Sequence, residues 1–117
     1  MKTILDRVNL PSLRSTFDTG NFLLVDENPL RALDVLLPYV SHVHFKDFRS
    51  MAEGRYKSLA GQSFEGFHLG AGDVDLTTIT HKLRDAGYQG AFVLEYEGLG
   101  SEAEGIRKSF AYFNSII

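Results

Sequence analysis

Segments with extended and helical patterns alternate along this chain of 117 residues, and this alternation restricts the fold more than any other feature. Short apolar stretches predict strands at residues 13–17, 41–45 and 91–94. Helical spacing or helix caps predict helices at residues 2–8, 28–38, 76–86 and 101–116. Strands that alternate with helices form parallel sheets through right-handed crossovers. We therefore predict an α/β fold in one domain over residues 1–117, with few strands for a parallel sheet that needs cover on both faces.

The predicted helix ends depend on capping residues. Asn28 precedes Pro29, which suits the first helical position, and Asp75 and Ser101 are N-cap types. Between the second and third helices, residues 48–73 show no clear period and are interrupted by glycine. We predict an irregular segment there, and a loop of this length inside a compact domain is usually functional or mobile.

Composition excludes several classes of function. The net charge is −3 and no cluster of Lys or Arg occurs, so a nucleic-acid partner is not expected. The chain has no cysteine, which excludes disulfides and thiolate metal sites and fits a cytoplasmic protein. No apolar run approaches the roughly 20 residues that cross a bilayer, so a membrane partner is not expected either. Asp6 and Arg7 interrupt the apolar pattern at the N-terminus, which argues against a secretory signal.

A polar residue lies at or near the end of each predicted strand: Asp18, His44 and Glu95. The carboxyl ends of parallel strands share one edge of the sheet, where ligands bind in α/β folds. Taken singly, Asp18 can cap a turn, His44 can be a core histidine and Glu95 can be a solvated acid. Together they form an oxygen and nitrogen ligand set that suits Mn²⁺, Co²⁺, Mg²⁺, Fe²⁺ or Zn²⁺.

Four motifs carry a resemblance to a known family: "STFDTGNF" (15–22), "HVHFKDF" (42–48), "LGAGDVDL" (69–76) and "GYQGAFVLEYEG" (87–98). With their order and spacing, the chain resembles the C-terminal part of the xylose-isomerase-like sugar phosphate isomerase/epimerase superfamily. That family folds as a (β/α)₈ TIM barrel. The resemblance implies that this chain forms the last three βα units of such a barrel, an incomplete barrel with parallel strands.

The resemblance also implies a metal site. Asp18, His44 and Glu95 match three of four ligands of a divalent cation, most commonly Mn²⁺, with Mg²⁺ or Co²⁺ as alternatives. Glu95 also matches one of two catalytic glutamates that move a proton beside a carbonyl group. The metal polarises this carbonyl and stabilises the enediolate. The implied function is a metal-dependent isomerase or epimerase of a sugar or sugar phosphate.

The "HVHFKDF" stretch alternates, as a barrel strand should. We expect Val43 and Phe45 to pack under helices, and His42, His44 and Lys46 to face the barrel interior. Lys46 either contacts substrate or forms an ion pair with a neighbouring aspartate. His42 lies deeper, and we expect it to be structural.

The chain departs from the family pattern in two ways. The fourth metal ligand, which is the other catalytic glutamate, belongs to an earlier strand and is absent, as are five βα units. The family often has a substrate-binding arginine where Gly66 stands, although His68 lies close by. Asn21 either caps the turn after Asp18 or contacts substrate. A related nuclease branch needs a histidine at Asn21 and further ligands at Phe64 and Gly66, so we reject a nuclease function.

The expected partners follow from the incomplete barrel. We expect a small sugar substrate, and either a homo-oligomer or the missing N-terminal half of the barrel. Open strand edges are a common route to association. The alternative function is a catalytically incomplete fragment that acts at most as an interaction module.

Overall fold

The computed structural model describes residues 1–117. Its helices, including two 3₁₀ turns (η), are α1 (Lys2–Val8), η1 (Asn21–Val25), α2 (Pro29–Leu36), η2 (Leu37–Tyr39), α3 (Leu76–Asp85) and α4 (Glu102–Ile116). Its strands are β1 (Ser15–Asp18), β2 (Val40–Phe45), β3 (Asp47–Ser50), β4 (Tyr56–Lys57), β5 (Ser63–Phe67) and β6 (Phe92–Leu94). No helix has both the length and the hydropathy needed to cross a membrane.

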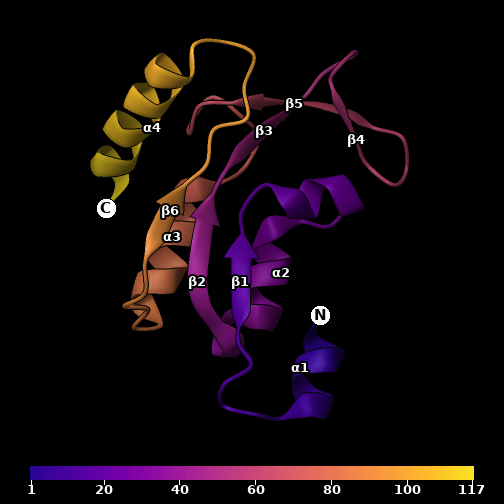
Figure 1. Cartoon of the computed structure of the whole chain (residues 1–117), viewed down its shortest axis with the longest axis vertical. Helices are drawn as coiled ribbons and strands as arrows, with labels where there is room; N and C mark the ends of the chain where they lie inside the picture. The colour runs from indigo at the N-terminus through magenta and orange to yellow at the C-terminus, as the bar shows by residue number, and fades with distance from the viewer.

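Strands β1, β2 and β6 form one parallel sheet in the order β1-β2-β6 (Figure 1). Asp18 pairs with His44 across the first ladder, and His44 pairs with Val93 across the second. The predicted α/β fold with three parallel strands and no closed barrel is therefore confirmed. Strand β1 both begins and ends later than the predicted strand at residues 13–17, and Asp18 is its last residue rather than the residue after it.

Helices α2 and α3 lie on one face of the parallel sheet, and α4 lies beside β6 (Figure 1). The sheet residues on that face are buried: Phe17 and Val43 are 0% exposed and Phe45 is 1% exposed. The Phe45 ring packs against Phe113 of α4, with 5.2 Å between ring centroids. As expected from the alternation in β2, the apolar residues pack under helices while His42 and His44 stay partly exposed.

The predicted helix caps are present. Asn28, Asp75 and Ser101 each accept a hydrogen bond from a backbone N–H two or three residues later. Gly87 ends α3 with a φ of 78°, a conformation that glycine adopts without strain. Local side-chain chemistry therefore sets the helix ends, as the sequence indicated.

The prediction of an irregular segment at residues 48–73 was wrong. This segment contains an antiparallel sheet in the order β3-β5-β4, which we call the cover sheet. Asp47 pairs with Phe67 and Ser50 pairs with Phe64. The cover strands span only four, two and five residues, and β5 contains Gly66, so no single stretch has a periodic signal. Pairing between segments, rather than local pattern, creates this sheet.

The cover sheet crosses the carboxyl ends of the parallel strands (Figure 1). Asp47 connects the two sheets and is only 1% exposed. Its carboxylate accepts backbone hydrogen bonds from Gly70 and Gly72 at 3.0 Å and from Val74 at 3.2 Å. These bonds hold the loop before α3 against the start of β3, and so fix the cover over the strand ends.

Candidate metal centre

The carboxyl ends of the parallel strands bring Asp18, His44 and Glu95 together. One ligand atom from each lies within 4.8 Å of the others. His44 Nδ1 is 3.0 Å from Glu95 Oε1 and 4.0 Å from Asp18 Oδ2. Each side chain is partly exposed, between 15% and 33%, so an ion can reach them from solvent. We call these residues the metal triad.

The two oxygens of Asp18 have different partners. Oδ1 accepts hydrogen bonds from the backbone N–H groups of Gly20 at 3.0 Å and Asn21 at 2.9 Å. These bonds hold the turn that leads from β1 into η1 and leave Oδ2 directed toward His44 and Lys46. Asn21 is exposed at the start of η1, and its main chain rather than its side chain orients Asp18.

Lys46 lies among three carboxylates. Its ammonium is 2.8 Å from Glu97 Oε1, 2.9 Å from Glu95 Oε2 and 3.4 Å from Asp18 Oδ2. The side chain is only 7% exposed. Burial alone would lower the pKa of Lys46, but hydrogen bonds to Glu97 and Glu95 outweigh it and raise that pKa above its ordinary value. Lys46 is therefore a fixed positive charge next to the metal triad.

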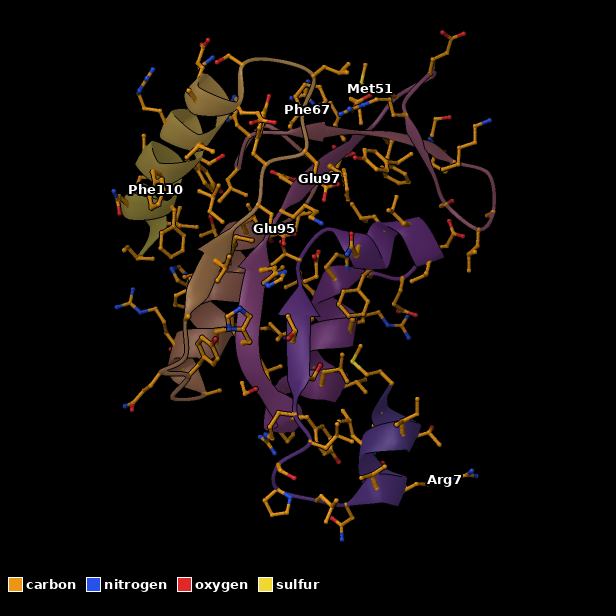
Figure 2. The ribbon with its side chains drawn as sticks, in the orientation of Figure 1. Arg7, Met51, Phe67, Glu95, Glu97 and Phe110 are labelled. Atoms are coloured by element: carbon orange, nitrogen blue, oxygen red, sulfur yellow. The ribbon has the colours of Figure 1, made fainter.

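Sequence reasoning missed Glu97, which follows Glu95 by two residues. In an extended segment such residues point to the same side, so the Glu95-Tyr96-Glu97 spacing contained a signal. Figure 2 labels both, with Glu95 at the strand ends and Glu97 nearer the cover sheet. Burial acts to raise the pKa of Glu97, but hydrogen bonds from Lys46 and Tyr56 hold that pKa below its ordinary value.

The cover sheet approaches the site through main-chain contacts. Gly66 forms an isolated parallel bridge with Gly98. A Cβ added at Gly66 would lie 2.4 Å from the carbonyl oxygen of Glu97, so no side chain fits there. The family's substrate-binding arginine therefore has no room at this position. Arg55 lies nearby instead, and it binds Glu65 at 2.7 Å and the Glu97 carbonyl at 2.5 Å.

His68, a predicted substrate contact, lies apart from the metal triad. It lines a hollow of about 210 Å³ together with Phe67, Tyr96 and Leu99. Its Nδ1 is 3.1 Å from the Leu69 carbonyl oxygen. Larger hollows of about 400 and 440 Å³ lie beside α2, and no triad residue lines either of them. The triad therefore opens on the uncovered side of the parallel sheet rather than into one of these hollows.

The donors around the triad fit a divalent cation. Two carboxylates and an imidazole give oxygen and nitrogen ligands without sulfur, a set that suits Mn²⁺, Mg²⁺ or Co²⁺. With Glu97 and Lys46 included, three carboxylates face one ammonium. Three carboxylates (−3) and one ammonium (+1) sum to a formal charge of −2, which a divalent cation would neutralise.

Comparison with known proteins agrees with this architecture. A family model described as "Xylose isomerase-like TIM barrel" matches residues 1–116. The chain belongs to this xylose isomerase-like family. The resemblance inferred from the sequence motifs is thereby confirmed.

Two sequence relatives are inosose dehydratases. The chain is 30% identical over 103 residues to inosose dehydratase 1 from Bacillus cereus (strain ZK / E33L), which covers 83% of this chain and 35% of the relative. It is 33% identical over 87 residues to inosose dehydratase from Lacticaseibacillus casei, covering 69% of this chain and 29% of the relative. The chain thus spans about a third of the length of these relatives.

Solved structures share the fold. A xylose isomerase domain protein from Planctomyces limnophilus matches with a TM-score of 0.78 at 24% identity, over 97% of this chain and 39% of that chain. The 3-keto-D-glucoside 4-epimerase from E. coli matches with a TM-score of 0.66 at 20% identity, over 95% of this chain and 36% of that chain. Both matches show that the chain shares its fold with part of a larger protein.

Proposed function

We propose that this chain is the metal-holding part of an isomerase or epimerase that moves a proton beside the carbonyl group of a sugar or sugar phosphate. The convergence of Asp18, His44 and Glu95 at the strand ends carries this proposal. Mn²⁺ is the proposed cation, with Mg²⁺ or Co²⁺ as alternatives. When bound, it would supply a positive charge for the carbonyl oxygen.

The proposed roles divide between the two oxygens of Glu95. Oε1 lies 3.0 Å from His44 Nδ1, on the side where the cation would be held. Oε2 forms an ion pair with the Lys46 ammonium at 2.9 Å, and we propose that it is the oxygen that accepts a proton from the substrate carbon. Asn21, exposed next to Asp18, is a candidate substrate contact, whereas His68 faces a different hollow.

A second carboxylate is needed to return the proton on the opposite face of the carbon, and we propose that it lies outside this chain. The rest of a longer barrel, or another polypeptide, would supply it. The length of the relatives supports this view, because the chain covers only 35% of inosose dehydratase 1. If no such partner exists, the chain is a fragment of the fold that acts at most as an interaction module.

Dehydration is a second candidate reaction, favoured by the sequence relatives, which are inosose dehydratases. Loss of water from a polyhydroxylated ketone begins with the same proton removal beside a carbonyl. The two reactions differ in the product, since an epimerase returns the proton and a dehydratase releases a hydroxyl group. Incubation of candidate ketoses and inososes in D₂O, followed by NMR, separates deuterium incorporation from formation of an unsaturated product.

The first test of the proposal is metal binding. We expect Mn²⁺ to raise the melting temperature of the chain, because a ligand at about 100 times its dissociation constant stabilises the folded state by about 2.7 kcal/mol. We expect Asp18→Asn to lose most of this shift. The asparagine oxygen can still accept hydrogen bonds from the N–H groups of Gly20 and Asn21, so the variant keeps the turn between β1 and η1.

Asp85→Asn is the matched control, since Asp85 is exposed at the end of α3. It should keep the full Mn²⁺ shift. An equal Mn²⁺ shift in Asp18→Asn and in the control would refute a cation site at the strand ends. A wild-type chain that does not respond to millimolar Mn²⁺, Mg²⁺ or Co²⁺ would favour the interaction module.

A further inference from the structure

We propose that Glu97 is a positioning residue that holds the Lys46 ammonium and thereby leaves the carboxylates of Asp18 and Glu95 available to a divalent cation. This inference rests on the proposed function, because it concerns the same cation site. Neither the strand-end pattern nor the family resemblance predicted a role for Glu97.

The ammonium of Lys46 has three N–H groups and three carboxylates to bind. Its shortest contact is with Glu97 Oε1 at 2.8 Å, while Glu95 Oε2 lies at 2.9 Å and Asp18 Oδ2 at 3.4 Å. The Lys46 side chain is only 7% exposed, so few water molecules can bind the ammonium in place of these carboxylates. Glu97 is the partner in this group that lies outside the metal triad.

Glu97 therefore decides how strongly Lys46 binds the triad. A buried ammonium needs paired charges around it. Without the Glu97 carboxylate, the remaining charged partners of Lys46 would be Asp18 and Glu95. The ammonium would then compete directly with a metal cation for the same oxygens, and the cluster would also lose one negative charge.

The cover sheet fixes Glu97 in place. The Tyr56 hydroxyl of β4 hydrogen-bonds to its carboxylate. Arg55 Nη2 donates to its carbonyl oxygen at 2.5 Å. These contacts come from a segment about 40 residues away along the chain. Glu97 therefore joins the cover sheet to the cation site through Lys46.

This arrangement also bears on the predicted substrate contact of Lys46. Since each N–H group of the ammonium has a carboxylate within 3.4 Å, none is left unpaired toward a substrate. Lys46 acts instead on Asp18 and Glu95, by orienting their oxygens and balancing their charge.

The test compares Mn²⁺ affinity across a double-mutant cycle in the 117-residue chain, with free Mn²⁺ measured by EPR. Glu97→Gln should weaken Mn²⁺ binding by about tenfold or more, and Lys46→Met should tighten it by a similar factor, because each changes the charge beside the cation. Glu97→Gln should weaken Mn²⁺ binding much less in the Lys46→Met background than in the wild-type chain, because Glu97 acts on the cation site through Lys46. Glu53→Gln, an exposed residue with the same change of charge, should have no effect.

Mn²⁺ affinity that falls in Glu97→Gln and rises in Lys46→Met distinguishes a positioning role from a structural one. General loosening of the site would weaken Mn²⁺ binding in both single variants. Weakening in both, or unchanged or tighter binding in Glu97→Gln, would overturn the inference. Circular dichroism of each variant checks that it is folded.

A second measurement does not depend on metal. In ¹H–¹⁵N NMR spectra, the ammonium protons of Lys46 should exchange slowly enough to be detected, and Lys46→Met assigns the signal. We expect Glu97→Gln to abolish or strongly broaden it. If wild type binds no Mn²⁺, the proposed function fails, while a Lys46 signal that depends on Glu97 still supports the pairing. A signal unchanged in Glu97→Gln would overturn the pairing itself.

Discussion

At the scale of the residue, Asp18 shows how one carboxylate serves both the fold and the site. Its Oδ1 accepts the N–H groups of Gly20 and Asn21, and its Oδ2 faces His44 and Lys46. The sequence left a turn cap and a metal ligand as alternative roles for Asp18. The geometry makes them compatible, because each role uses a different oxygen.

Asp47 leads to a prediction about pH. Burial raises the pKa of Asp47 to about 6, although the N–H groups of Val74, Gly72 and Gly70 act to lower it. The ordinary value is 3.8, so the folded chain holds this proton more tightly than the unfolded chain. The contribution of Asp47 to stability is therefore complete below pH 4 and is lost as pH rises through 6. The loss should be about 3 kcal/mol.

Urea unfolding between pH 4 and 7 tests this prediction against Asp47→Asn, which cannot titrate. Groups whose pKa is lowered by folding, such as Glu65 and Glu97, contribute the opposite slope in both proteins and cancel in the difference. The stability of wild type relative to the variant should fall with pH. A rise would mean that the three N–H donors stabilise the carboxylate more than burial destabilises it.

Sequence reasoning identified the site residues whose positions follow from the predicted strands. Asp18, His44 and Glu95 stand at or near the ends of three strands, and strand ends can be located from local pattern. Glu97 could not be found in this way. Its role depends on Lys46, Tyr56 and Arg55, which come from distant segments that only the folded chain brings together.

At the scale of the element, the parallel strands and helices were predictable and the cover sheet was not. The parallel strands have apolar or alternating sequences, and the helices between them have recognisable caps. The cover strands are as short as two residues and gain their definition from antiparallel partners. A fold can therefore be inferred from its regular layer while the part that shapes the site escapes detection.

One buried hydroxyl links helix α4 to the loop before α3. Ser109 is 0% exposed, and its Oγ accepts the backbone N–H of Leu69 at 3.0 Å. Replacement by alanine would leave this N–H without a partner, and we expect a loss of about 1–3 kcal/mol in the free energy of unfolding. Urea denaturation measures this loss.

Ser115→Ala is the control on the same helix. Ser115 is exposed, and its hydroxyl donates only to the Tyr112 carbonyl one turn earlier. Its replacement should change stability by less than about 0.5 kcal/mol. Equal effects of the two substitutions would mean that the Leu69 contact does not anchor α4.

At the scale of the whole molecule, the parallel sheet has two open edges, at β1 and β6. On either side of β6, the Glu95 N–H donates to the Phe45 carbonyl and the Ala91 carbonyl accepts from the Val43 N–H. Because successive residues of a strand alternate their hydrogen-bonding direction, the N–H groups of Phe92 and Leu94 face outward. Unpaired edges of this kind promote association with other strands.

Amide hydrogen exchange tests whether this edge associates. If chains pair through β6, exchange at Phe92 and Leu94 should slow as protein concentration rises. The amide of Glu95, already bonded to Phe45 at 2.9 Å, should show no such dependence and serves as the internal control. Exchange that is fast and independent of concentration at Phe92 and Leu94 would exclude β6 as the contact.

The two faces of the parallel sheet differ in a way that bears on the missing strands. The helix-covered face holds Phe17 and Val43, both 0% exposed, whereas the uncovered face presents Thr16, His42 and His44. Water can solvate the polar side chains of that second face, so a sheet of only three strands exposes little apolar surface there. The cost of having only three strands is instead the unpaired backbone N–H and C=O groups along the outer sides of β1 and β6. A short strand added from another chain at each of these sides would pair most of them.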